Sequence, residues 1–207
     1  SAFSKLSWAQ ALVCKPGVTP RQTSGPFYPT VEFQADQLDT NADLVVLDGS
    51  SVKAKGDIVI VEGIVMDQNC NVLSGVLVEI WQACVSGRYN HEDDPNTSPL
   101  DPHFQYWGKA LTDENGFYRF RTIIPGVYPA SEGWDRPPHI HFKITRTGYA
   151  ELITQMYFKG HKLNDLDQIL QSLKKPDQDK LVVEFKQQVG FPHPVGKFDI
   201  QLKKAVF

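Results

Sequence analysis

Short stretches that alternate apolar and polar residues recur along this chain from residue 57 onward, separated by Gly, Asn and Asp. The clearest case is residues 57–66 (DIVIVEGIVM), which the turn-like residues 67–71 (DQNCN) follow directly. A period of two places successive side chains on opposite faces of a strand, which is typical of β-structure and not of helices. Many short strands of this kind predict an all-β chain folded as an antiparallel, prealbumin-like β-sandwich with long loops.

The same pattern predicts further strands, and one segment with a helical pattern. The strands are expected at residues 75–81, 108–112, 117–122, 140–145, 152–158, 180–185 and 197–202. Residues 113–116 (DENG) lie between two of them and are a hairpin signal. The short helix would be capped by Asn164 and ended by Pro176. Its apolar face would consist of Leu166, Ile169, Leu170 and Leu173.

The chain has 207 residues, which is long enough for one domain with a substantial core. Residues 1–55 have no regular pattern, and we expect them to form an arm that wraps the sandwich without being a separate domain. Residues 56–207 would then form the sandwich domain. Within it, residues 86–105 are a polar loop much longer than a hairpin needs, and such loops are usually functional or disordered.

Charge and hydropathy exclude some classes of partner. The 21 Lys and Arg residues nearly balance the 24 Asp and Glu residues, so no basic footprint for nucleic acid or an anionic membrane is present. The sequence has no apolar run long enough for a bilayer and no signal-peptide pattern. We therefore expect a cytoplasmic protein. Because the chain begins at Ser1 and not at a methionine, the alternative is a periplasmic protein that has lost an export signal.

The three cysteines, Cys14, Cys70 and Cys84, are too few for a disulfide framework or a thiolate metal site. Cys84 follows an apolar run and is expected to be a small buried hydrophobic residue. Cys14 and Cys70 lie in turn-like surroundings, and the sequence leaves open whether they pair.

The most informative motif is the pair His139 and His141 in residues 136–142 (RPPHIHF). If a strand begins at His139, both imidazoles project from the same face of a sheet. An HxH pair alone more often marks hydrogen-bonded structural histidines, since short motifs match by chance. Two tyrosines change this balance, because Tyr89 opens the long loop and Tyr128 ends the turn PGVY. A pair of imidazoles side by side is a poor way to fill a core and is well suited to holding a metal ion.

Taken together, these segments resemble the intradiol ring-cleavage dioxygenases, which are non-haem iron enzymes that cleave catechols between their two hydroxyls. The similarity runs from about Thr23 to the C-terminus and comprises several motifs in the same order. They are residues 23–29 (TSGPFYP), 78–83 (VEIWQA), 87–89 (GRY), 111–113 (LTD), 117–129, 136–142 (RPPHIHF) and 152–158 (LITQMYF). In size and motif order the chain is most similar to the iron-binding chains of the protocatechuate 3,4-dioxygenase type.

The resemblance implies an Fe(III) cofactor and a set of residues around it. The implied ligands are Tyr89, Tyr128, His139 and His141. The implied substrate-side residues are Arg136 and Gln155 in catalytic roles, with Pro26, Tyr28 and Trp81 binding substrate. Charge balance is consistent with this set, because Fe(III) with two tyrosinates and one hydroxide is neutral, as a low-dielectric site requires. We expect Tyr128 to act also as an internal base that a bound catechol displaces.

The implied partners are O2 and a small aromatic diol, either protocatechuate-like or catechol. The product would be a dicarboxylic acid of the cis,cis-muconate type. Hydroxyquinol and substituted catechols stay open as substrates, because no residue that would neutralise a substrate carboxylate is evident. The chain would work as a homo-oligomer or with a homologous second chain.

A rival interpretation belongs to another class of function. Residues 112–128 also resemble prealbumin-like sandwich modules that bind or adhere without catalysis. Such a module would have no use for Tyr89, the HxH pair or Arg136 at these spacings.

Overall fold

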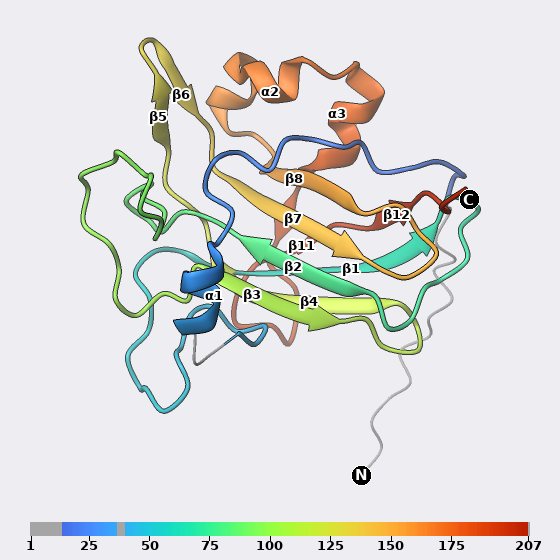
Figure 1. The fold of residues 1–207 in the computed structure, drawn as a ribbon, viewed down its shortest axis with the longest axis horizontal. Helices are drawn as coiled ribbons and strands as arrows, with labels where there is room; N and C mark the ends of the chain where they lie inside the picture. The colour runs from blue at the N-terminus through green and yellow to red at the C-terminus, as the bar shows by residue number, and fades with distance from the viewer. Residues whose placement is uncertain (1–13, 37–39, 207) are drawn as a thin grey trace.

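Two β-sheets pack face to face in the computed structural model, which describes residues 14–36 and 40–206 (Figure 1). The first sheet has the order β10–β11–β1–β12, with β4 also paired to β1; its strands are β1 (Ile58–Asp67), β4 (Phe117–Ile123), β10 (Phe185–Lys186), β11 (Val195–Lys197) and β12 (Ile200–Leu202). The second has the order β3–β2–β7–β8–β9; its strands are β2 (Leu77–Trp81), β3 (Trp107–Leu111), β7 (His139–Thr145), β8 (Leu152–Phe158) and β9 (Val182–Val183). The predicted all-β sandwich is confirmed.

Most neighbouring strands are antiparallel, as expected, but three short pairs are parallel. These are β1 with β11, β1 with β12, and β8 with β9. Parallel neighbours need a long connection between them, whereas antiparallel ones can be joined by a hairpin. The helical segment between β8 and β9 supplies such a connection.

A small hairpin outside both sheets was not anticipated. Strands β5 (Tyr128–Ser131) and β6 (Trp134–Arg136) form it and project beyond the sandwich in Figure 1. It begins at Tyr128 and ends at Arg136, so it connects two of the predicted site residues through one pair of strands.

The predicted single helix is wrong in extent. The structure divides this segment into η1 (Lys162–Leu166), α2 (Gln168–Gln171) and α3 (Lys175–Leu181). Asp167 separates the first two with an extended backbone and caps α2 by accepting from Leu170 N. Asn164 is no cap, because it lies inside η1 and donates to Phe158 O. Pro176 lies in the first turn of α3, where a missing N–H costs nothing.

Three further local predictions need correction. The strand expected at residues 197–202 is interrupted at 198–199, which separate β11 from β12. The strand expected at residues 180–185 begins as the end of α3, which leaves only β9 and β10 as short strands. The irregular arm contains a short helix, α1 (Val31–Asp36), whose first turn is capped by Thr30 Oγ1 accepting from Phe33 N. No helix in the described residues is both long and apolar enough to cross a bilayer.

Strand β7 shows how the core and the site share one element. Ile140, Phe142 and Ile144 are fully buried between the sheets, and the Phe142 ring lies 6.3 Å from the ring of Tyr118 on β4. Burying each of these side chains contributes about 1.5–3 kcal/mol. Since side chains alternate along a strand, His139 and His141 project from the opposite, outer face.

The N-terminal arm covers part of this outer face. Gly17 N donates to Gln68 O, Thr19 N to Gln201 O, and Gln22 N to Ile153 O of β8. A disulfide between Cys14 and Cys70 ties the start of the described arm to the turn after β1. It resolves the pairing that the sequence left open. Cys84 is a buried free cysteine, as predicted. Residues 1–13 lie outside the described chain, and the division into arm (1–55) and sandwich (56–207) stays a prediction.

Candidate functional site

The four side chains predicted as metal ligands converge at one end of β7. The Tyr89 hydroxyl lies 3.3 Å from His139 Nε2 and 3.1 Å from His141 Nε2. The Tyr128 ring centre is 5.7 Å from that of Tyr89 and 5.8 Å from that of His139. The structure thus brings together one residue from the long loop, one from the start of β5 and two from β7.

Two glycines explain how the loop tyrosines come together. A Cβ atom at Gly87 would lie 2.2 Å from Val127 O, and one at Gly126 would lie 2.4 Å from Gly87 N. Only glycine allows two backbone segments to pass this closely, and Gly87 also has a positive φ of 83°. The contact places Tyr89 and Tyr128, which follow these glycines by two residues each, beside one another.

Both histidines are held with Nε2 facing the tyrosines. His139 Nδ1 lies 2.7 Å from Pro137 O, and because a carbonyl only accepts, Nδ1 carries the hydrogen and Nε2 keeps its lone pair. The ring of His141 stacks on Trp81 at 4.8 Å. Its buried Nδ1 has no hydrogen-bond partner in the described part of the chain.

Electrostatics keeps these imidazoles neutral. Burial, followed by the nearby charge of Arg136, lowers the pKa of His139 well below its usual value and that of His141 to about 3. Both rings therefore offer a lone pair at neutral pH, which is the form that binds metals.

The pKa values of the two phenols are shifted in the opposite direction. Burial raises the pKa of Tyr89 well above its usual value, and the neighbouring Tyr128 adds to this. Burial also raises the pKa of Tyr128, although the guanidinium of Arg136 counteracts it. Without a cation both groups stay protonated, whereas a bound trivalent ion would favour their phenolate forms.

The donor chemistry fits a ferric ion. Among the described residues, no group of three or more His, Cys, Asp or Glu side chains could hold a metal. The donors that do converge are two phenol oxygens and two imidazole nitrogens. A hard trivalent cation prefers anionic oxygen ligands, and imidazole suits iron, so these residues match the cofactor expected from the sequence.

Arg136 reaches the site from the end of β6 and is held by a buried network. Its Nε donates to Asp167 Oδ1 over 2.7 Å, and its Nη2 donates to Gln155 Oε1 over 2.7 Å and to the Tyr157 hydroxyl over 3.2 Å. Gln155 Nε2 in turn donates to Thr23 O of the arm over 2.9 Å. The network therefore connects the arm, β6, β8 and the cap of α2.

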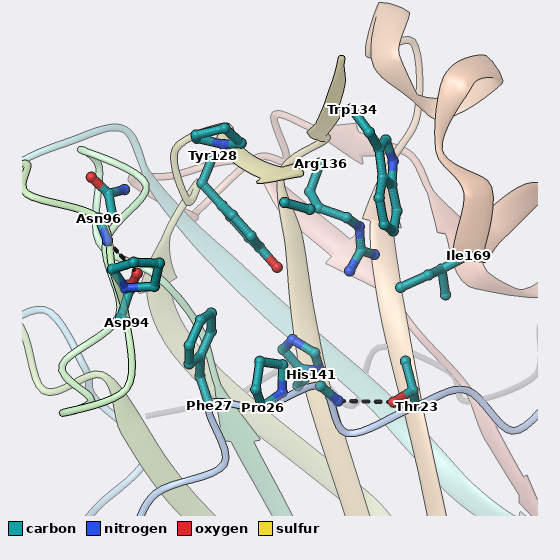
Figure 2. A pocket seen from close by; sticks show the side chains of 14 residues that line it. Thr23, Pro26, Phe27, Asp94, Asn96, Tyr128, Trp134, Arg136, His141 and Ile169 are labelled. Carbon is teal, nitrogen blue, oxygen red and sulfur yellow. Dashed lines mark hydrogen bonds between the residues drawn. The ribbon is translucent and has the colours of Figure 1, made fainter. Parts of the chain in front are cut away.

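A pocket of about 410 Å³ lies beside these groups (Figure 2). Figure 2 shows the Tyr128 hydroxyl and the Arg136 guanidinium pointing into the space above His141. The arm, the long loop, the β5–β6 hairpin, β7 and α2 all contribute to the wall. The lining residues are Thr23, Gly25, Pro26, Phe27, Asp94, Pro95, Asn96, Tyr128, Pro129, Ala130, Trp134, Arg136, His141 and Ile169.

The predicted substrate-side residues lie at different depths. Pro26 and Arg136 line the pocket, whereas Tyr28, Trp81 and Gln155 lie behind its wall. Trp81 supports the ring of His141, and the ring of Tyr28 packs edge-on against Trp81 at 4.9 Å. The roles assigned to these residues stay predictions.

Sequence reasoning missed several residues of the site, among them Asp94, Asn96, Trp134, Asp167 and Ile169. Asp167 offered one signal, because aspartate is a favoured N-cap and this one precedes a short apolar run. Ile169 was assigned only to a helix face. Asp94 and Trp134 lie in segments whose sequence has no periodic pattern.

Comparisons with known proteins are consistent with this geometry. A protein-family model described as "Dioxygenase" matches residues 25–204. The protocatechuate 3,4-dioxygenase beta chain of Burkholderia cepacia is 40% identical over 154 residues, which cover 72% of this chain and 65% of that protein. A catechol 1,2-dioxygenase of Acinetobacter baylyi is 32% identical over 155 residues, which cover 69% of this chain and 47% of that protein. The chain thus spans less than two thirds of the length of these curated relatives.

Solved structures share the fold. A 3-chlorocatechol 1,2-dioxygenase from Rhodococcus opacus 1CP superposes with a TM-score of 0.68 at 27% identity, covering 91% of this chain and 74% of that one. The dioxygenase domain of a carbohydrate-binding fusion protein from Streptomyces sp. SirexAA-E gives a TM-score of 0.66 at 28% identity, covering 91% and 100%.

Proposed function

Because the chain belongs to the intradiol dioxygenase family, we propose that it cleaves a catechol-type ring between its two hydroxyl-bearing carbons. O2 is the co-substrate, and the product is a dicarboxylic acid of the cis,cis-muconate type. The observation that carries this proposal is the convergence of Tyr89 with His139 and His141 within 3.3 Å, beside a pocket that contains Arg136.

Tyr89, Tyr128, His139 and His141 are the residues that would hold Fe(III). When bound, the ion would act as a Lewis acid toward the two catechol oxygens and would withdraw charge from the ring. The two imidazoles contribute neutral donors and the two phenols contribute negative charge, which together suit a trivalent ion in a buried site.

Tyr128 is the proposed internal base. A catechol must lose two protons to bind as a dianion, and the Tyr128 hydroxyl points into the pocket where these protons are released (Figure 2). Burial raises the pKa of this phenol despite the opposing charge of Arg136, so the phenolate that accepts a proton would form only with the ferric ion bound. The acceptor atom would be Tyr128 Oη.

Arg136 is the proposed stabiliser of negative charge on the ring. Its guanidinium stays cationic when buried, and a fixed donor in a dry pocket is worth more than one in water. The aromatic and aliphatic walls formed by Phe27, Trp134 and Ile169 would bind the ring by burial and exclude water.

The disulfide is an indication of the cellular compartment in which the protein works. Disulfides persist in oxidising compartments and are rare in the cytosol. The Cys14–Cys70 bond therefore favours a periplasmic or exported protein over the cytoplasmic expectation. We also propose that the chain works as a homo-oligomer or with a homologous second chain.

The test begins with iron analysis and the visible spectrum of protein purified with ferric iron. A tyrosinate-to-iron charge-transfer band and O2 uptake with a panel of catechols are expected. The variant His139→Ala should lose both, whereas His193→Ala, which lies outside the pocket lining, should keep both. A colourless protein without O2 uptake would contradict the proposal and favour the non-catalytic binding module.

A further inference from the structure

Asp94 fixes a carboxylate in the wall of the substrate pocket. Its Oδ2 accepts from Tyr89 N over 2.7 Å. Its Oδ1 accepts from Asn96 N over 2.9 Å (Figure 2). These bonds hold the acid on the same loop that carries Tyr89. The carboxylate therefore lies in the pocket wall and directly contacts the backbone of a proposed metal ligand.

The positive charge of the pocket is already paired. Within residues 14–36 and 40–206, Arg136 is the only cationic side chain that lines it. Two of its guanidinium nitrogens bond to Asp167, which is fully buried directly behind it. Asp94 in the wall and Asp167 behind Arg136 therefore give two negative charges against one positive charge, apart from the ferric centre, which its two phenolates and a hydroxide would leave neutral. A second anion brought by a substrate would meet no uncommitted cation among these residues.

The opposite wall gives an anion no better environment. Trp134 and Ile169 present aromatic and aliphatic surface there (Figure 2). A carboxylate placed against such surface would lose its hydration without receiving hydrogen bonds in return. At the rim, the neutral side chain of Asn96 can offer hydrogen bonds to an uncharged polar group.

We propose that this pocket selects ortho-diphenols with uncharged ring substituents, and that Asp94 is the residue that disfavours a ring carboxylate. The inference rests on the proposed function and names its substrate class. It separates this chain from its relative in Burkholderia cepacia, whose name indicates a carboxylated substrate.

A matched pair of substrates tests the charge alone. The iron-loaded protein is assayed by O2 uptake with 3,4-dihydroxybenzoate and with its methyl ester, which share the ring and differ in charge at one substituent. We expect kcat/KM to be about tenfold or more higher for the ester, because a factor of ten corresponds to about 1.4 kcal/mol and unit charges several ångströms apart in a partly buried site interact at least that strongly. Equilibrium binding, followed without O2 by the visible spectrum, should show the same order.

Three variants assign the effect to Asp94. Asp94→Asn should lower the ratio of kcat/KM for the ester to kcat/KM for the acid by about tenfold, whatever it does to turnover as a whole. Asn96→Asp adds a second carboxylate close to Asp94 and should increase the preference for the ester over the acid. Asp93→Asn removes the neighbouring acid, which is 75% exposed and does not line the pocket, and should change neither substrate.

The outcomes are distinct. A wild-type protein that prefers the acid, or an Asp94→Asn variant in which both substrates change equally, would overturn the inference. The wild-type comparison and Asn96→Asp decide the question even if Asp94→Asn does not fold. Failure to cleave any catechol would contradict the proposed function itself, and the proposed selectivity for uncharged substrates would then be rejected as well.

Discussion

Arg136 and Asp167 form a buried ion pair in which Nε donates to Oδ1 over 2.7 Å, with only 3% and 0% of the two side chains exposed. Asp167 has a second task, because its Oδ2 accepts from Leu170 N and so caps α2. That short helix carries Ile169 into the wall of the pocket. A single carboxylate thus positions both the cation of the site and one of its apolar walls.

We expect Asp167→Asn to impair both turnover and stability. The amide keeps an oxygen for the cap, but it leaves the buried guanidinium without a counter-charge. Breaking a buried pair in this way costs about 3–5 kcal/mol of unfolding free energy. Because the guanidinium is no longer held, kcat should fall by more than about tenfold while KM changes less.

The control for this prediction is Asp165→Asn, an exposed acid in the preceding turn that should change nothing. Chemical denaturation gives the stability and steady-state kinetics give kcat and KM. A folded Asp167→Asn protein with unchanged kcat would show that the ion pair does not position Arg136 for turnover.

The Arg136→Lys variant tests whether a positive charge at this position is enough for activity, or whether the geometry of the guanidinium is also required. Lysine keeps the positive charge but cannot make the forked contacts to Asp167 and Gln155 at once. The variant should still bind iron and keep its colour, because Arg136 is not among the proposed ligands. We expect kcat/KM to fall by about 10²–10³, as when one preorganised donor is lost from an active site. Full activity would exclude a role for the guanidinium fork.

The local parts of the fold could be predicted from the sequence, because they depend on neighbouring residues. The period-two pattern of β7 placed Ile140 and Phe142 in the core, and it placed His139 and His141 together on the other face. The split of the predicted helix was not evident. It depends on the extended backbone of Asp167, and that conformation is coupled to a contact with Arg136.

The non-local parts of the site could not be derived from periodicity. Tyr89, which lies 50 residues from His139, was noticed beside the histidines as a loop tyrosine, but its role as a ligand came only from the family resemblance. The physical cause is the close passage of Gly87 against Val127, which no local pattern reveals. The pairing of Cys14 with Cys70, separated by 56 residues, is a similar case.

Tyr128→Phe tests the internal base. The variant keeps the aromatic ring, which packs at 5.7 Å from that of Tyr89, and loses only the hydroxyl. We expect it to bind iron but to form its catechol complex at least about a hundredfold more slowly without O2, because one proton acceptor is gone. Stopped-flow absorption measures this rate. Tyr149→Phe, outside the pocket lining, is the control, and unchanged loading by Tyr128→Phe would exclude the role.

The disulfide should stabilise the chain and, through the arm, the pocket. In the chain-entropy account, closing a loop of 56 residues contributes about 4 kcal/mol. Reduction, or the double variant Cys14→Ala/Cys70→Ala, should therefore lower Tm and the unfolding free energy by a similar amount. The arm supplies Thr23 and Pro26 to the pocket, so KM for catechol should also rise when the bond is absent. A reductant should have no further effect on the double variant. Equal stability of the oxidised and reduced wild-type protein would contradict a structural role for this bond.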